Sequence, residues 1–300
     1  MRVTNQMMST TYLKDLNKNL NNLNTLNKQL TTGKEISKPS DNPFKTARIM
    51  QMYSDISANK QYNENIKDTI NWLDTTDVAL EQIGNSAQRI RELMVSAGNA
   101  SYGSDEKNAL KEEINEKINE IAQVLNTNYD GKYIFGGTKS LSKPVGVEKD
   151  SNGNNILVFK DDNGNSFNEE GKAYIKNADG TITRDANGNL AVEANPKPEY
   201  EKLLNQMNAN LSVEVSNGVN MNYNVGTPSI LTLKNGNNVM KLLNDVVNNL
   251  DKVDSSDVIK GNLEEMDLFV SNVSSIRGEV GAKQNRMDSA KTQNEEQNLT

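Results

Sequence analysis

The residue types that carry most enzyme and metal chemistry are missing from this 300-residue chain. It contains no histidine and no cysteine. The commonest general base near neutral pH, the commonest metal ligand, disulfides and thiolate chemistry are therefore excluded. A Ser–His–Asp triad and an HExxH zinc site are impossible as well. No carboxylate pair stands out as a general acid and base, so we predict no catalytic residue, no cofactor and no small-molecule substrate.

Three Asp-x-Asn-Gly-Asn segments resemble the first half of a calcium-binding loop. They are Asp150–Asn154, Asp161–Asn165 and Asp185–Asn189. None has glycine at the sixth position, and none has the bidentate glutamate at the twelfth. The same residue types are typical of β-turns. We therefore predict turns here and no metal site.

A charged group beside a helical apolar seam is the remaining candidate for binding. Arg89, Arg91 and Glu92 flank the seam residues Ile90 and Met94. The residues by themselves favour ion pairs on a solvated surface. A contact face for a partner protein is the other interpretation, and both stay open at this point.

Composition argues against one large globular core. Hydrophobic residues make up 35% of the chain, below the ~45–50% of typical domains. The net charge of −7 gives no reason to expect a nucleic-acid partner. No run approaches the ~18 apolar residues of a membrane span, and the N-terminal residues lack the apolar region of a secretory signal peptide. Long helices with narrow apolar seams suit this composition.

The first such helix is predicted over about residues 5–32. Its leucines recur at spacings of three, four, three and seven residues, at Leu13, Leu16, Leu20, Leu23 and Leu30. This heptad-like spacing places them on one face of a helix that is otherwise polar. Such a helix is marginal alone in water, so the leucine face predicts a partner helix and assembly. Packing into an ordinary bundle core is the alternative.

Two further helical regions surround a different kind of sequence. After the break at Pro39–Pro43, where Ser40 or Asp41 is expected to cap, an apolar seam runs to about Gly98. A third helix is expected from Ser104 to near Asn128. The helical period returns after Gly236 for about 50 residues, so two long helices of equal length can pack antiparallel.

Between these helices, residues 139–235 alternate short apolar stretches with Asn-Gly and Asp-Gly turns. The best hairpin pairs Leu211–Val215 with Val219–Val225. We predict a mainly α fold, an elongated antiparallel bundle of long helices, with this β-rich insert at one end as a separate core.

Several segments resemble the hook-associated protein 3 family, the hook–filament junction proteins of the flagellin superfamily. They are Met1–Met8, Leu30–Pro43, Trp72–Leu80, Arg89–Leu93, Asn128–Thr138 and Ile276–Asn285. The segment Gly131-Lys-Tyr-Ile-Phe-Gly136 separates junction proteins from flagellin, which usually has a different ending there.

The resemblance implies the domain division. Residues 1–38 would be a D0-like helical arm, 39–138 and 236–300 the two halves of a D1-like bundle, and 139–235 a D2-like inserted domain. Family members continue into an apolar helix that pairs with the N-terminal one. Because that C-terminal D0 helix is not in this chain, we expect the arm to be unpaired.

The resemblance also implies a structural role outside the cell. Subunits would assemble into a ring, and contact another hook-associated protein and flagellin. Export would use a flagellar chaperone and the type III export apparatus, without a cleaved signal peptide. Three alternatives remain: flagellin itself, a flagellin-like protein whose Arg89, Arg91 and Glu92 face binds an innate immune receptor, and an enzyme inserted into the scaffold.

Overall fold

The computed structural model describes residues 2–36, 38–40, 42–98, 103–185, 188–250 and 256–299. The chain divides into two compact units, residues 1–61 and 62–300. The long helix α2 (Pro43–Ala97) begins in the first unit and ends in the second.

The first unit contains α1 (Arg2–Thr32) and the opening turns of α2. Gly33, in the left-handed region at φ 65°, ends α1 by donating its N–H to the carbonyl of Gln29 at 2.8 Å. The cap of α2 is Asn42, whose Oδ1 accepts the N–H of Lys45 at 3.1 Å. Of the two caps predicted from sequence, Ser40 is not the one used, and Asp41 lies outside the described residues. Pro43, the last residue of the predicted break, is the first residue of α2.

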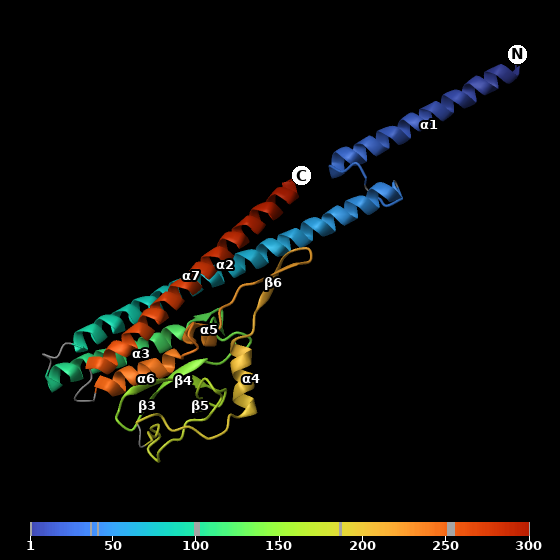
Figure 1. Ribbon diagram of the computed structural model, residues 1–300. Helices are drawn as coiled ribbons and strands as arrows, with labels where there is room; N and C mark the ends of the chain where they lie inside the picture. Colours follow the sequence, from blue (N-terminus) through green and yellow to red (C-terminus); the bar gives the residue numbers. More distant parts are fainter. Residues whose placement is uncertain are drawn as a thin grey trace. The chain divides into compact units, whose positions relative to one another are not determined.

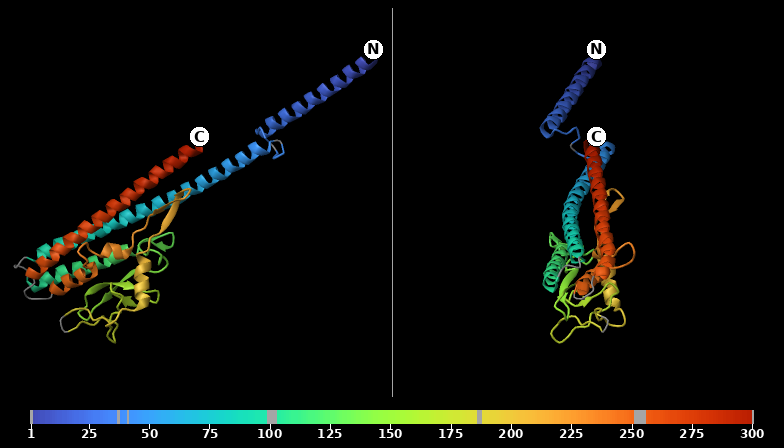
Figure 2. Two further views of the ribbon diagram at one scale, coloured as in Figure 1. Left: turned by 45° about the vertical axis from the view of Figure 1, so that its right-hand side comes forward. Right: turned by 60° about the vertical axis from the view of Figure 1, so that its left-hand side comes forward.

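The second unit holds a bundle formed by α2, α3 (Ser104–Leu125), α6 (Val239–Leu250) and α7 (Ser256–Leu299) (Figure 1). The helical run after Gly236 was expected to match α2 in length. It consists instead of two helices, because α6 folds against α3 and α7. Residues 251–255, between these two helices, lie outside the described residues. Figure 2 shows α7 alongside α2 from two further sides.

The predicted β-rich insert contains small antiparallel sheets. The strands β3 (Val145–Lys149), β4 (Asn155–Lys160) and β5 (Ser166–Phe167) form one sheet in the order β3-β4-β5. The predicted hairpin is confirmed as β6 (Ser212–Ser216) and β7 (Val219–Asn222), with Val213 opposite Met221. Before the insert, β1 (Asn128–Tyr129) pairs with β2 (Lys132–Tyr133) around the Asp130–Gly131 turn.

Two short helices interrupt the strands, and the sequence analysis missed both. They are α4 (Pro198–Met207) and α5 (Thr227–Leu231). Each begins with a proline at its first or second position, and α4 has glutamates in its first turn. These are ordinary start signals of a helix, so α4 could have been recognised.

The Asp-Asn-Gly segments are turns, and the turn recurs five times. Residues 150, 161, 168, 177 and 185 each accept the N–H of a glycine three positions later. All five glycines have positive φ, between 72° and 86°. Oδ1 of Asp150 accepts the N–H groups of Asn152 and Asn154, so backbone donors occupy the carboxylate. In the fifth turn, Asn187 lies outside the described residues.

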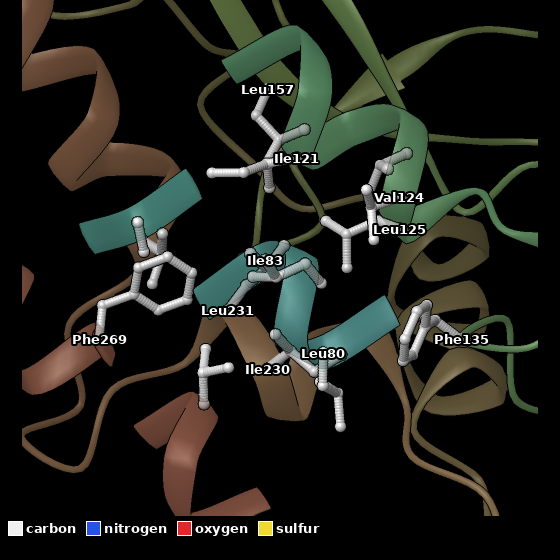
Figure 3. Packing of buried hydrophobic residues seen from close by; sticks show 14 of the residues in the cluster. Leu80, Ile83, Ile121, Val124, Leu125, Phe135, Leu157, Ile230, Leu231 and Phe269 are labelled. Atoms are coloured by element: carbon white, nitrogen blue, oxygen red, sulfur yellow. The ribbon is translucent and has the colours of Figure 1, made fainter. Parts of the chain in front are cut away.

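The prediction that the insert forms a separate core is wrong. One cluster of buried side chains joins Leu80 and Ile83 of α2, Ile121 of α3 and Phe269 of α7 with Leu157 of β4 (Figure 3). The strand β4 is buried on both faces. Its Leu157 and Phe159 join the bundle, while Ile156 and Val158 pack with Ile182 in a small second cluster. The insert therefore completes the bundle core, and the boundaries at 138/139 and 235/236 remain predictions.

The segment Ile134–Thr138 holds the insert against the bundle. Phe135 is fully buried, and its carbonyl accepts both the N–H and the hydroxyl of Thr227 at 2.9 Å. Gly137 has φ 57°, and a Cβ there would lie 2.5 Å from the carbonyl oxygens of Gln206 and Met207. Only glycine fits this close approach to the end of α4.

Candidate assembly surfaces

The leucine face of α1 is exposed along its length. The exposed fractions are 54% for Leu13, 44% for Leu16, 51% for Leu20, 57% for Leu23 and 82% for Leu30. Leu26, which the sequence analysis left out, is 55% exposed. A contiguous stripe of exposed leucines is unusual on a soluble surface and marks a place where another apolar surface binds. The exposed leucines include all five residues of the predicted seam. The role of this seam in assembly stays a proposal.

The opening turns of α2 expose further large apolar residues. They are Phe44, Ile49, Met50, Met52, Tyr53 and Ile56. The apolar seam predicted from the Pro39–Pro43 break to about Gly98 runs through this stretch. They make the first unit rich in exposed apolar side chains.

Polar contacts fix the turn between α1 and α2. Nε2 of Gln29 donates to the carbonyl of Glu35 at 3.0 Å, and Nζ of Lys45 pairs with Glu35 at 2.9 Å. This turn is the segment Leu30–Pro43, one of those that carried the family resemblance. Its residues therefore define the geometry between two consecutive helices of the first unit.

The residues of the second predicted site, Arg89, Arg91 and Glu92, form ion pairs within the molecule. Arg89 forms ion pairs with Glu92 at 3.1 Å and with Glu113 of α3 at 2.7 Å, while Arg91 pairs with Asp267 of α7. All three predicted residues therefore form ion pairs. This is the result expected if they belong to a solvated surface. The side chains of Arg89 and Glu92 remain about half exposed, so a partner could still reach them.

Further polar contacts set the register between α2 and α7, and the sequence analysis did not anticipate them. Arg277 donates to both carboxylate oxygens of Asp77 at 3.0 Å, and Gln284 donates to Asp74 at 2.8 Å. Together with the Arg91–Asp267 pair, they show that residue numbers rise along α7 as they fall along α2. The two helices are therefore antiparallel, as predicted. Arg277 and Asp77 both lie in segments of the family resemblance, which was the available signal.

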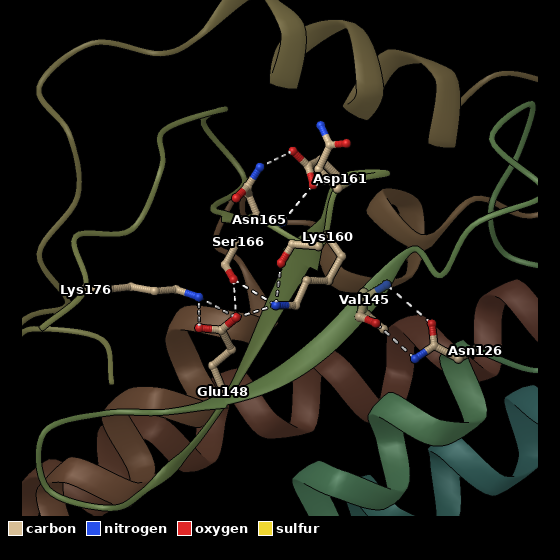
Figure 4. Close-up of polar contacts among 10 residues, drawn as sticks. Asn126, Val145, Glu148, Lys160, Asp161, Asn165, Ser166 and Lys176 are labelled. Atoms are coloured by element: carbon tan, nitrogen blue, oxygen red, sulfur yellow. Dashed lines mark hydrogen bonds and ion pairs between the residues drawn. The ribbon is translucent and has the colours of Figure 1, made fainter. Parts of the chain in front are cut away.

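A polar network joins the strands of the insert (Figure 4). The carboxylate of Glu148 on β3 accepts from Lys160, Lys176 and Ser166. Burial raises the pKa of Glu148, but these hydrogen bonds outweigh it and leave the pKa below its ordinary value. The amide of Asn126, after α3, donates to the carbonyl of Val145 at 3.0 Å and so anchors β3 to the bundle.

Neither a metal cluster nor a membrane helix emerges from the part of the chain that the structure describes. No group of three or more acidic residues there is arranged to hold a metal ion. Likewise, none of its helices is long and apolar enough to cross a bilayer. The candidate surfaces above are apolar or charged.

Comparison with known proteins supports the family resemblance stated from sequence. Residues 3–140 match the sequence model of the bacterial flagellin N-terminal helical region. Among curated relatives, flagellin of Salmonella paratyphi A is 29% identical over 145 residues, which are 48% of this chain and 29% of that protein. A phase 1 flagellin of Salmonella naestved is also 29% identical over 134 residues. The chain thus aligns with less than a third of the length of these relatives.

Solved structures share the fold over most of the chain. A protein of Vibrio parahaemolyticus, described as a flagellar hook-associated protein, has a TM-score of 0.63 at 18% identity, covering 87% of this chain and 96% of its own. FlgL of Bacillus cereus has a TM-score of 0.55 at 20% identity, covering 85% and 98%. Hook-associated protein 3 of Legionella pneumophila has a TM-score of 0.52 at 17% identity. These likenesses confirm the predicted fold, a mainly α, flagellin-like bundle with a small β region.

Proposed function

We propose that this chain is a structural subunit of the bacterial flagellum at the junction between hook and filament. The observation that carries the proposal is the extent of the fold: 87% and 83% of this chain align with 96% and 95% of two proteins named as hook-associated proteins. The curated flagellins that it matches, by contrast, align with 44% to 48% of this chain and with less than a third of their own length. This coverage favours a junction protein over flagellin itself.

The exposed apolar stripe of α1 supplies a means of assembly. A helix whose leucines are about half exposed gains stability when a second helix covers them. In this proposal, Leu13, Leu16, Leu20, Leu23 and Leu30 pair with a terminal helix in the assembled ring. The ring contacts another hook-associated protein on one side and flagellin on the other.

Export belongs to the same proposal. The subunit is delivered outside the cell by the flagellar type III apparatus with the help of a chaperone, and no signal peptide is cleaved. The absence of cysteine suits a chain that is exported unfolded, since it has no disulfide to form on arrival. We assign no catalytic role to the protein.

Localisation is the decisive experiment. Labelled antibody against this chain should mark the hook–filament boundary in electron micrographs of flagella from the producing bacterium. Label along the whole filament would instead identify a flagellin. An absence of label on intact flagella that carry a detectable hook–filament boundary would contradict both readings.

One second function has a specific observation behind it. Arg89 and Glu92 stay about half exposed while paired, so their helix face could bind an innate immune receptor. A pull-down with the receptor ectodomain tests this, with Arg89→Ala as the variant expected to weaken capture. An enzymatic insert would be exposed by an activity screen of the whole chain.

A further inference from the structure

Three aromatic rings from distant parts of the chain line one small cleft in the second unit. Trp72 of α2 lies perpendicular to Tyr129 of β1, with ring centroids 5.9 Å apart and planes at 78°. Tyr223, which follows β7, lies 5.8 Å from Trp72 at 89°. The cleft has a volume of about 240 Å³. Perpendicular rings around a cavity of this size form the walls of an aromatic cage.

The indole of Trp72 is buried but lacks a hydrogen-bond acceptor. Trp72 is 6% exposed, and its Nε1 has no partner among the described residues. A buried N–H without an acceptor costs free energy, and such groups are rare in native proteins. The nearby hydroxyl of Thr69 is engaged with the carbonyl of Asn65 at 2.7 Å. The indole nitrogen is itself buried, so Trp72 contributes its ring, and not its N–H, to the lining of the cleft.

Two carboxylates give the cleft a negative rim. Asp68 and Asp130 line it together with Lys132. Within the described part of the chain, none of these three side chains is assigned an ion pair or a hydrogen bond. Asp130 is held in place by its turn, at φ 50°, where the N–H of Gly131 donates to Asn128 at 2.9 Å. The rim thus carries two acidic groups and one basic group.

These features indicate which chemical class of ligand the cleft can bind. Faces of aromatic rings attract cations, most strongly quaternary ammonium groups, and adjacent carboxylates add to that attraction. A metal ion would need more oxygen ligands than two carboxylates supply.

We propose that this cleft binds a small organic quaternary ammonium compound, of the type represented by choline. The methylated ammonium group lies among Trp72, Tyr129 and Tyr223, with Asp68 and Asp130 at its edge. This site is independent of the proposed role in the flagellum, and its test does not require assembly.

The chain reports binding at this site by itself, because Trp72 is its single tryptophan. Choline chloride should change the tryptophan fluorescence of the full chain in a saturable way at constant ionic strength. The neutral analogue 3,3-dimethylbutan-1-ol, which has the same shape without the charge, should give no saturable change. Equal responses to both compounds, or no saturable response to choline, would overturn the proposal.

Variants locate the effect in the cleft. Asp68→Asn combined with Asp130→Asn should weaken choline binding about tenfold or more, since a fold-change of ten is a modest loss for two charges beside a cation. Glu64→Gln, which removes a carboxylate elsewhere on α2, should bind choline like the original chain. Both carboxylates are exposed, so the variants should fold, as circular dichroism would verify. Unchanged affinity in the double variant would overturn the proposal.

Discussion

Arg184 and Asp150 form a buried ion pair, with Nε of the guanidinium donating to Oδ2 of the carboxylate at 2.6 Å. Their side chains are 7% and 0% exposed. The same guanidinium donates to Oδ1 of Asn244 on α6 at 2.7 Å. One arginine therefore links a turn that lies 34 positions earlier in the insert to a helix of the bundle.

Loss of this arginine should be costly. Arg184→Met leaves Asp150 buried without its partner, and breaking a buried pair in this way costs about 3–5 kcal/mol. Urea denaturation should show that loss as a lower midpoint with an unchanged slope. Lys172→Met, which breaks the more exposed pair with Glu170, should cost less than about 1 kcal/mol. Equal losses in the two variants would contradict the structural role given to Arg184.

Excision of the insert should destabilise the helices. Replacing residues 139–235 with a short Gly/Ser linker removes Leu157, Phe159 and Met207 from the shared core. Each large buried side chain contributes about 2–5 kcal/mol, so the melting temperature of the helical signal should fall by at least about 10 °C. Thermal circular dichroism measures this. A cooperative transition at the original temperature would restore the interpretation of the insert as an independent domain.

Glu148 should make stability sensitive to acid. Its pKa in the folded chain lies below the ordinary value, so its contribution is fully present above about pH 4.3 and is lost as pH falls through the folded pKa. Glu148→Gln should therefore lower the free energy of unfolding at pH 7 by about 1–2 kcal/mol, with a difference that shrinks below about pH 4.

Denaturant titrations of both chains at several pH values test this expectation. Glu170→Gln is the matched control, because Glu170 pairs with a single lysine and is 59% exposed. A difference between Glu148→Gln and the original chain that stays constant with pH would argue against a titrating role for Glu148.

Gly137 is a position where an added methyl group should be poorly tolerated. Gly137→Ala imposes a left-handed backbone on alanine and places its Cβ 2.5 Å from two carbonyl oxygens. Gly236→Ala imposes a similar backbone at φ 85° but meets no atom within 4 Å. The first should cost about 1–3 kcal/mol more than the second, because only it adds a steric conflict. Chemical denaturation of both variants gives the difference directly.

Leu20→Asp should separate assembly from folding. Leu20 is half exposed, so its replacement should change the free energy of unfolding of the chain by less than about 0.5 kcal/mol. In the flagellum of the producing bacterium, the same change should block incorporation, because it places a charge in the leucine face. Asn19→Asp adds the same charge beside that face and should be incorporated normally. Normal incorporation of Leu20→Asp would remove the leucine face from the proposed assembly.

Local features of the molecule could be predicted from sequence alone. The approximate bounds of α1, α2 and α3, the leucine face of α1, the β6–β7 hairpin and the Asp-Asn-Gly turns depend on residues within a few positions of one another. Periodicity and turn preference describe such short-range relationships well. The absence of histidine and cysteine likewise needed no structure to limit the chemistry of the chain.

Only the tertiary structure decided which surfaces meet. The four consecutive apolar residues of β4 indicate that both of its faces can be buried, but not that Leu157 faces α3 while Ile156 faces Ile182. In the same way, Arg91 and Asp267 are 176 positions apart, and Trp72, Tyr129 and Tyr223 come from three separate elements. A sequence pattern identifies a face that must be covered; the partner that covers it is chosen by packing over the whole chain.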